Sequence, residues 1–160
     1  MPCYLFSYHT YRSWMPDRPQ GYVQRGNGIL PCDPRMADLY CEAATYDEAL
    51  LNEEHQIIIV ERLRGAVNHI GCRLHFVATE PTHIHMLVSW RDERPWQLKR
   101  TSLKRSITIE LKARFDDRPW LSNGSSRKRV KDQQHFDYLV TKYLPDHSGW
   151  KWCEVRGLFK

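Results

Sequence analysis

Apolar and polar residues alternate along three stretches of the chain, with the period of half-buried β-strands. Residues 4–14, YLFSYHTYRSW, form the first stretch, and residues 72–79 and 83–90 form the other two. Only Glu80-Pro81-Thr82 separates the last two stretches, so we expect a tight hairpin that makes them antiparallel neighbours.

Two further stretches carry apolar residues at helical steps of three, four and seven. The first covers residues 47–70 and is followed by Gly71, which stands where a C-terminal cap is expected. The second covers residues 96–115, where an apolar stripe repeats every four residues. A shorter helix is predicted over 132–144, ending near Pro145, and the Trp-rich tail predicts a last strand.

The connectors complete the plan of the fold. Residues 15–35 are rich in Pro and Gly and predict a long loop, and residues 116–134 predict a Gly/Ser-rich loop that turns basic. The order strand, helix, strand, strand, helix is that of the α+β class. We expect one domain over residues 1–160, with a ferredoxin-like or RRM-like antiparallel sheet and helices packed on one face. The other face of such a sheet is free to hold a ligand.

Composition narrows the class of protein. The chain has 24 Lys and Arg against 19 Asp and Glu, a formal charge of +5 that favours polyanionic partners. Its five cysteines are scattered and contain no C-x-x-C pair, so neither a disulfide framework nor a zinc knuckle is expected. No signal peptide or membrane-spanning segment is evident. We therefore expect a cytoplasmic protein without a membrane partner.

Two histidines stand out in the third strand. His83 and His85 are two residues apart, so their imidazoles point to the same face of the sheet. Two neutral imidazoles can chelate a divalent ion, but a third ligand must come from elsewhere in the chain. The spacing alone also fits two ordinary strand histidines.

The surrounding residues favour the metal site. EPTHIHMLVSW, residues 80–90, resembles the P-x-H-h-H-h-L-h strand of the HUH endonucleases. More narrowly, the chain is similar to the single-tyrosine HUH transposases of small bacterial insertion sequences and to their REP-associated relatives. The resemblance extends to the Lys-, Ser- and Thr-rich helix WQLKRTSLKRSITIELKARF and to the basic loop SNGSSRKRVKD, and it covers most of residues 4–152.

The resemblance implies an endonuclease and strand transferase that uses a tyrosine on the helix after the basic loop. Such a tyrosine attacks single-stranded DNA and forms a 5′-phosphotyrosine intermediate. Tyr138 and Tyr143 both qualify, and the family often has a metal ligand four residues after the nucleophile. His147 follows Tyr143 at that spacing, whereas Lys142 follows Tyr138, so we predict Tyr143 as the nucleophile and His147 as the third metal ligand. Pro145 interrupts the helical register that this spacing assumes.

Partners and cofactor follow from the same resemblance. A divalent metal, Mg²⁺ or Mn²⁺, would assist the reaction, and imidazole ligands suit Mn²⁺ somewhat better. The expected partner is single-stranded DNA with a hairpin, and the chain is expected to form a homodimer. Phosphate contacts are predicted for two basic clusters: Arg100, Lys104 and Arg105 on the helix, and Arg127, Lys128 and Arg129 in the loop.

The sequence also allows other interpretations. The basic clusters could be solvated surface, and no base for the tyrosine is evident, although His9 and Glu80 are possible neighbours. A binding-only relative would keep the fold and bind single-stranded nucleic acid without cleavage. A histidine-triad nucleotide hydrolase also uses His-hydrophobic-His, but it expects a third histidine at position 87, which is Leu.

Overall fold

The computed structural model describes residues 1–24 and 26–160 of the chain. Its elements are, in order, β1 (Cys3–His9), β2 (Tyr22–Gln24), β3 (Gly28–Leu30), α1 (Pro34–Ala43), α2 (Glu53–Ile70), β4 (Arg73–Glu80), β5 (His83–Ser89), α3 (Trp96–Arg114), β6 (Ser126–Arg129), α4 (Gln133–Tyr138), the π-helical turn η1 (Leu139–Tyr143), β7 (Lys151–Cys153) and β8 (Gly157–Phe159).

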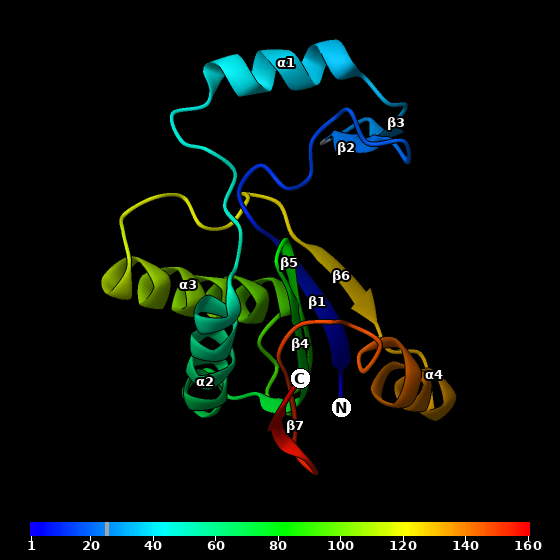
Figure 1. Cartoon of the computed structure of the whole chain (residues 1–160). Helices are drawn as coiled ribbons and strands as arrows, with labels where there is room; N and C mark the ends of the chain where they lie inside the picture. The colour runs from blue at the N-terminus through cyan, green and yellow to red at the C-terminus, as the bar shows by residue number, and fades with distance from the viewer. Residues whose placement is uncertain (25) are drawn as a thin grey trace.

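Six strands form one antiparallel sheet in the order β6-β1-β5-β4-β7-β8 (Figure 1). The first four, taken with α2 and α3, reproduce the order of a ferredoxin-like sheet, in which β1 and β4 flank β5. This arrangement confirms the predicted α+β class with an antiparallel sheet. The hairpin of β4 and β5 is also confirmed, and it places Glu80 opposite His83.

Helices α2 and α3 cover one face of the sheet (Figure 1). Ile84, Met86 and Val88 of β5 point to this side and are almost fully buried in a core with residues of both helices. Helix α2 begins at Glu53, later than the predicted position 47, because Asn52 and His55 form a capping box there. It ends at Gly71, whose φ of 72° makes the predicted left-handed cap.

The opposite face of the sheet carries a second, smaller core. Leu5, Phe76 and Leu87 of the sheet pack there with Leu139 and Leu144, which lie just after α4. Short helix α4 and η1 therefore lie across the face that holds the odd-numbered side chains of β5. Those side chains include His83 and His85, so the helix that contains the candidate tyrosines is next to the histidine pair.

Two predicted loops contain regular structure. In the 15–35 connector, β2 and β3 pair as a separate two-stranded sheet, and Asp33 and Pro34 start α1 as N-cap and first helical residue. This segment extends away from the sheet (Figure 1). The basic stretch 126–129, also expected to be a loop, is the edge strand β6, because its backbone pairs with the otherwise open edge of β1.

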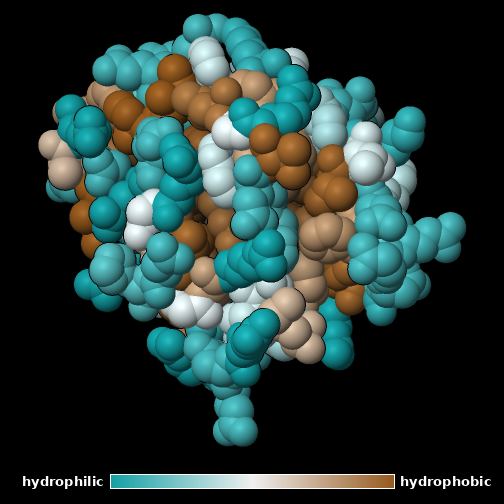
Figure 2. Space-filling view, turned by 90° about the horizontal axis from the view of Figure 1, so that it is seen from below, coloured by the Kyte–Doolittle hydropathy of each residue, from teal (hydrophilic) through white to brown (hydrophobic). Residues whose placement is uncertain are grey.

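Hydrophilic and hydrophobic residues are mixed on the surface. On the face seen in Figure 2, hydrophilic residues surround and interrupt the hydrophobic groups over most of the area. Among the described residues, no helix is both long and apolar enough to cross a membrane.

Candidate active site

Three histidines from two distant parts of the chain meet on the α4 side of the sheet. His83 and His85 come from β5, and His147 comes from the loop between η1 and β7. One ring nitrogen of each lies within 4.8 Å of the others. The sheet register explains the first two positions, since residues two apart on a strand share a face.

Each of the three imidazoles has a hydrogen-bond partner at Nδ1. Ser7 Oγ lies 2.6 Å from Nδ1 of His85, and Thr82 Oγ1 lies 3.0 Å from Nδ1 of His83. His147 Nδ1 donates to the carbonyl oxygens of Tyr143 and Leu144, at 3.0 and 3.2 Å. A carbonyl only accepts, so Nδ1 of His147 carries a proton, and in the neutral imidazole Nε2 is then the nitrogen that can bind a metal. Nδ1 partners of this kind orient the Nε2 atoms of metal-binding histidines.

Burial keeps the strand histidines neutral. Desolvation, followed by the neighbouring His147 and His83, lowers the pKa of His85 to about 3. Desolvation, followed by His147, also lowers the pKa of His83. Because metal binding needs unprotonated imidazoles, both side chains are ready to act as ligands at neutral pH.

Tyr143 lies beside this cluster. Its hydroxyl is 3.4 Å from Nε2 of His85, and its ring centroid is 5.2 Å from that of His147. The residue ends η1, where Leu144 N–H bonds to Leu139 O five residues earlier in place of the usual four. Leu139 and Leu144 are thereby both buried against the sheet, which directs Tyr143 toward β5. Single π-turns of this type occur often at functional sites.

Regular helical structure ends at Tyr143, before Pro145, so the helical spacing used to predict His147 does not by itself place that residue. A different set of contacts positions the loop of His147. Glu80 accepts hydrogen bonds from the backbone N–H and the hydroxyl of Ser148, at 2.6 and 2.8 Å. Two residues further, Thr79 Oγ1 donates to the carbonyl of Trp150 at 2.6 Å. The last two residues of β4 therefore hold the loop that places His147 beside the strand histidines.

Gly149 fits closely in the same loop. A Cβ atom at this position would lie 2.1 Å from the Thr79 carbonyl oxygen and 2.5 Å from Oε1 of Gln56. The buried Gln56 accepts from Trp150 N–H at 3.0 Å, and its Oε1 lies 3.0 Å from Thr79 Oγ1. Helix α2, strand β4 and the loop are thus joined behind the histidine cluster.

Tyr138, the other candidate nucleophile, has a different environment. Its side chain is 54% exposed, and its ring stacks on Tyr143 with 6.5 Å between centroids. Burial, followed by Tyr138, raises the pKa of the Tyr143 hydroxyl. Tyr143 is therefore the tyrosine that contacts the histidines, and Tyr138 extends its aromatic surface outward.

A fourth histidine borders the cluster. His9 pairs with His83 across β1 and β5, and the two ring centroids are 5.8 Å apart. The His9 ring also packs against Trp14, with 4.4 Å between ring centroids. The Arg18 guanidinium carbon lies 4.2 Å from the centroid of the Trp14 ring. Burial, followed by His83 and Arg18, lowers the pKa of His9 to about 4. Glu80, the other possible base, bonds to Ser148.

The predicted phosphate-binding residues lie around β6 and α3. Arg100 Nη1 donates to the Ser125 carbonyl at 3.1 Å, and Lys104 Nζ donates to the carbonyls of Ser122 and Asn123. These two cations therefore bind the loop that leads into β6. Arg105 is exposed on α3, and Arg127, Lys128 and Arg129 are exposed on β6.

The register of β6 against β1 shows which side of the sheet each β6 side chain faces. Lys128 pairs with Leu5 and so points to the histidine side of the sheet. Arg127 pairs with Phe6 and points to the α3 side, where its guanidinium lies 4.0 Å from the Trp96 ring centroid. Of the cations on β6, Lys128 thus lies on the same face as the candidate active site.

Sequence patterns alone did not identify the residues that orient the histidines. Ser7 becomes relevant only through the pairing of β1 with β5, and Gln56 and Gly149 only through the packing of the last loop. The cluster as a whole can hold one divalent cation next to a phenol hydroxyl. Such an arrangement can bring a phosphate and a tyrosine oxygen together.

Comparison with known proteins identifies the fold. No protein-family model matches the chain, and no curated protein matches it in sequence. One similar solved structure is a REP-associated tyrosine transposase bound to a REP hairpin; the identity is 6%, the TM-score is 0.50, and the match covers 87% of this chain and 62% of that one. Another is a candidate transposase from Deinococcus radiodurans R1, with 15% identity, a TM-score of 0.51 and 92% of each chain covered. The resemblance to tyrosine transposases that the sequence suggested therefore holds for the fold.

Proposed function

We propose that the chain is a transposase-like enzyme of the single-tyrosine HUH type, which cleaves and rejoins single-stranded DNA through Tyr143. The observation that carries this proposal is the position of the Tyr143 hydroxyl, 3.4 Å from Nε2 of His85 in a cluster with His83 and His147. The shared fold with two transposases supports it.

The residues present fit a divalent metal. Three imidazoles offer nitrogen donors with their Nδ1 atoms already hydrogen-bonded, and nitrogen donors favour Mn²⁺ over Mg²⁺, which prefers oxygen and water. A bound ion would polarise the scissile phosphate and stabilise the charge that develops on its oxygens. We propose His83, His85 and His147 as its protein ligands.

The chemistry of the chain itself is a transesterification. The Tyr143 oxygen attacks the phosphorus atom, the bond from phosphorus to the 3′ oxygen breaks, and a 5′-phosphotyrosine forms. The phenol proton leaves to solvent, and the departing 3′ oxygen takes up a proton, so the step needs no net proton. Attack by the free 3′-hydroxyl of another strand would reverse these bond changes and join the DNA.

The DNA would approach from the α4 side of the sheet. Lys128 points to that side, and Tyr138 offers an exposed ring for base stacking. Arg129 pairs with Tyr4 and so points to the α3 side, as does Arg105 on α3, so these two predicted phosphate contacts lie on the other face of the sheet. The DNA hairpin bound by the similar transposase suggests a substrate of single strands with a hairpin for this chain as well. Homodimer formation stays a prediction, which analytical ultracentrifugation would test.

A cleavage assay tests the proposal. The protein is incubated with Mn²⁺ and a labelled pool of randomised single-stranded DNA, and protein-linked label is separated on a denaturing gel. We expect linked DNA with the natural chain and none with Tyr143→Phe. A binding-only protein of the same fold would shift the DNA on a native gel without forming any linked product.

A further inference from the structure

Arg18 brings a positive charge to the histidine cluster from the segment that follows β1. Its guanidinium carbon lies 4.2 Å from the centroid of the Trp14 ring, which packs against His9 with 4.4 Å between ring centroids. The His9 and His83 ring centroids are 5.8 Å apart. Burial is the largest cause that lowers the pKa of His9 and of His83, and the charge of Arg18 adds to it in both. Arg18 therefore lies beside the cluster, on the side of His83.

Hydrogen bonds hold the start of this segment against the turn between β4 and β5. Thr10 N–H donates to the carbonyl oxygen of Thr82 at 2.9 Å, and Ser13 Oγ donates to the same oxygen at 3.0 Å. Thr82 precedes His83, and its Oγ1 lies 3.0 Å from Nδ1 of that histidine. The segment that carries Arg18 is thus joined to the residue next to a candidate metal ligand.

No carboxylate neutralises the charge of Arg18 in the part of the chain that the structure describes. Arg62, Arg64 and Arg73 each pair with a glutamate, whereas the half-buried Arg18 has neither an ion pair nor a side-chain hydrogen bond among the described residues. Its contact with the Trp14 ring is a cation–π contact, which orients the guanidinium without supplying an acceptor oxygen. An arginine in this arrangement can donate hydrogen bonds to an anion that approaches the histidine cluster.

Arg18 and Lys128 lie on opposite sides of the cluster. Lys128 pairs with Leu5 and so lies toward the start of β1, whereas the segment with Arg18 follows the end of β1, beyond His9. A DNA strand that passes over Tyr143 along the direction of β1 and β5 can therefore meet a cation on each side of the histidines.

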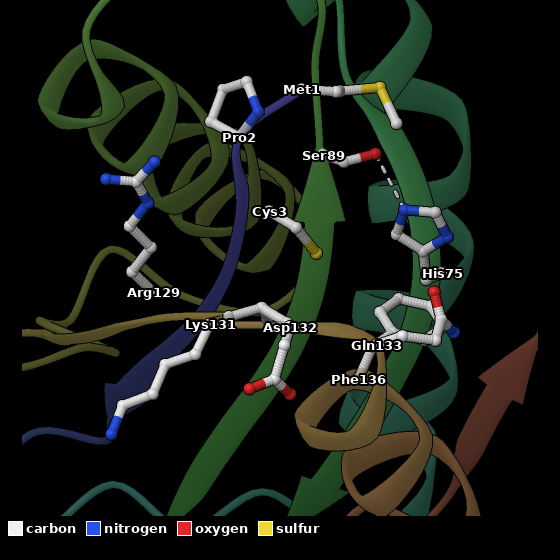
Figure 3. Close-up of a pocket in the computed structure, with 11 residues that line it drawn as sticks. Met1, Pro2, Cys3, His75, Ser89, Arg129, Lys131, Asp132, Gln133 and Phe136 are labelled. Atoms are coloured by element: carbon white, nitrogen blue, oxygen red, sulfur yellow. Dashed lines mark hydrogen bonds between the residues drawn. The ribbon is translucent and has the colours of Figure 1, made fainter.

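The large cavity at the other end of β5 is less suited to a phosphate. It has a volume of about 770 Å³ and lies between the start of β1, His75 and the start of α4 (Figure 3). Two of its polar side chains already have partners, because Ser89 Oγ lies 2.8 Å from Nε2 of His75 and Gln133 donates to a carboxylate of α4 at 2.8 Å. Asp132 also brings a negative charge to its wall. The surroundings of Arg18 contain no such competing groups among the described residues.

We propose that Arg18 binds a phosphate group of the DNA strand next to the one that Tyr143 attacks, and so holds the strand across the histidine cluster. The Trp14 ring keeps the guanidinium in place for this contact. The identity of the strand as a substrate rests on the proposed function. Phosphate binding by Arg18 does not depend on cleavage, so the two can be tested separately.

The first test measures phosphate binding without cleavage. Binding of a labelled single-stranded oligonucleotide of random sequence is followed by fluorescence anisotropy over a series of salt concentrations, with a chelator present. We expect Arg18→Gln to weaken binding about tenfold at low salt, because a charge-assisted contact is lost. The slope of log affinity against log salt should fall by about 1. Arg18→Lys should keep the slope of the natural chain, because the charge remains.

Arg35→Gln is the matched control, since it removes the same charge from an exposed position on α1, which lies away from the sheet (Figure 1). It should leave both the affinity and the slope as they are in the natural chain. Equal effects of Arg18→Gln and Arg35→Gln, or an unchanged slope in Arg18→Gln, would overturn the proposal.

The second test separates binding of the strand from the chemical step. The rate at which protein-linked DNA forms with Mn²⁺ is measured against the concentration of DNA. Arg18→Gln should raise KM about tenfold and change kcat less than about twofold, because the phosphate that Arg18 contacts does not react. The affinity for Mn²⁺, measured by calorimetric titration, should not fall. A lower Mn²⁺ affinity in Arg18→Gln would mean that Arg18 positions the histidines instead, and would overturn the proposal.

A neutral methylphosphonate in place of a phosphate next to the mapped cleavage site locates the contact. It should weaken binding by the natural chain about tenfold and leave binding by Arg18→Gln unchanged. An equal loss in both proteins would place Arg18 elsewhere on the strand and refute the proposal. Linked DNA with an unchanged KM in Arg18→Gln would refute the phosphate contact and leave the proposed function intact. A reduced salt slope in Arg18→Gln without any linked DNA from the natural chain would refute the proposed function alone.

Discussion

The hydroxyl oxygen of Tyr143 lies 3.4 Å from Nε2 of His85, although 58 residues separate them in the chain. This contact exists because η1 crosses the face of the sheet that carries the odd-numbered side chains of β5. It depends on the burial of Leu139 and Leu144, which fixes how the π-turn faces the sheet. The phenol is thus held next to the histidine cluster by hydrophobic packing.

Removing a histidine of the cluster should weaken metal binding. We expect His147→Ala to lower the affinity for Mn²⁺ about 100-fold, because two imidazoles remain to hold the ion. Glu80→Gln should lower it about tenfold, because the loop that carries His147 loses part of its anchor at Ser148. Calorimetric titration of the metal-free chain measures both values.

The matched control is His69→Ala on the outer surface of α2, which should bind Mn²⁺ as the natural chain does. Equal affinities for His147→Ala and His69→Ala would contradict the assignment of His147 as a ligand.

Gly149 should tolerate no larger side chain. A methyl group there would overlap the Thr79 carbonyl and the Gln56 amide, so we expect Gly149→Ala to destabilise the chain by about 1–3 kcal/mol and to displace His147. Gly124→Ala is the control, since a Cβ atom at that position has no neighbour within 4 Å. Urea denaturation and Mn²⁺ titration of the two variants test this. Equal stability and equal metal affinity of the two variants would show that the close fit at Gly149 does not position the loop.

The stability of the metal-free chain should depend on pH through its buried histidines. Burial is the largest cause of the lowered pKa values of His85, about 3, and His9, about 4, compared with 6.5 for an unperturbed histidine. Below pH 6.5 these two histidines bind protons in the unfolded chain but stay unprotonated in the folded chain. The free energy of unfolding should therefore be highest above pH 6.5 and should fall as the pH is lowered toward 4.

Urea denaturation midpoints measured across this pH range, with a chelator present, give the slope of the unfolding free energy against pH. In His9→Gln the slope should be smaller, because one of the two depressed pKa values is removed. A slope that is the same in His9→Gln and in the natural chain would mean that His9 is not desolvated as described.

Binding of single-stranded DNA should weaken steeply with salt. If Lys128 neutralises one phosphate, Lys128→Ala should reduce the slope of log affinity against log salt by about 1. Arg64→Ala, which removes the same charge from α2 on the other side of the sheet, should leave the slope unchanged. Fluorescence anisotropy with a labelled oligonucleotide measures this, and an equal change in both variants would indicate a general charge effect.

The main elements of the fold were predictable because they depend on local patterns. The alternation around His83 and His85, the apolar stripe from Leu103 to Leu111 and the cap at Gly71 each mark an element by its own residues. Strand β6 was not predictable in this way. All four of its residues are exposed, and it is a strand only because the edge of β1 needs a partner.

The site was partly predictable for the same reason. His83 and His85 share a face by strand geometry alone, and the proximity of Tyr143 follows from the fold that the resemblance implied. The position of His147 was inferred from helical spacing, whereas in the structure it depends on Glu80, Thr79 and Gln56, which lie far from it in sequence. Long-range contacts of this kind leave no periodic signal in the sequence.

The most direct test is to identify the amino acid that becomes linked to DNA. The chain is incubated with single-stranded DNA and Mn²⁺, the DNA is trimmed with nuclease, and the peptides are analysed by mass spectrometry. We predict a nucleotide on Tyr143, retained in Tyr138→Phe and absent from Tyr143→Phe. A nucleotide on Tyr138 that persists in Tyr143→Phe would contradict the account.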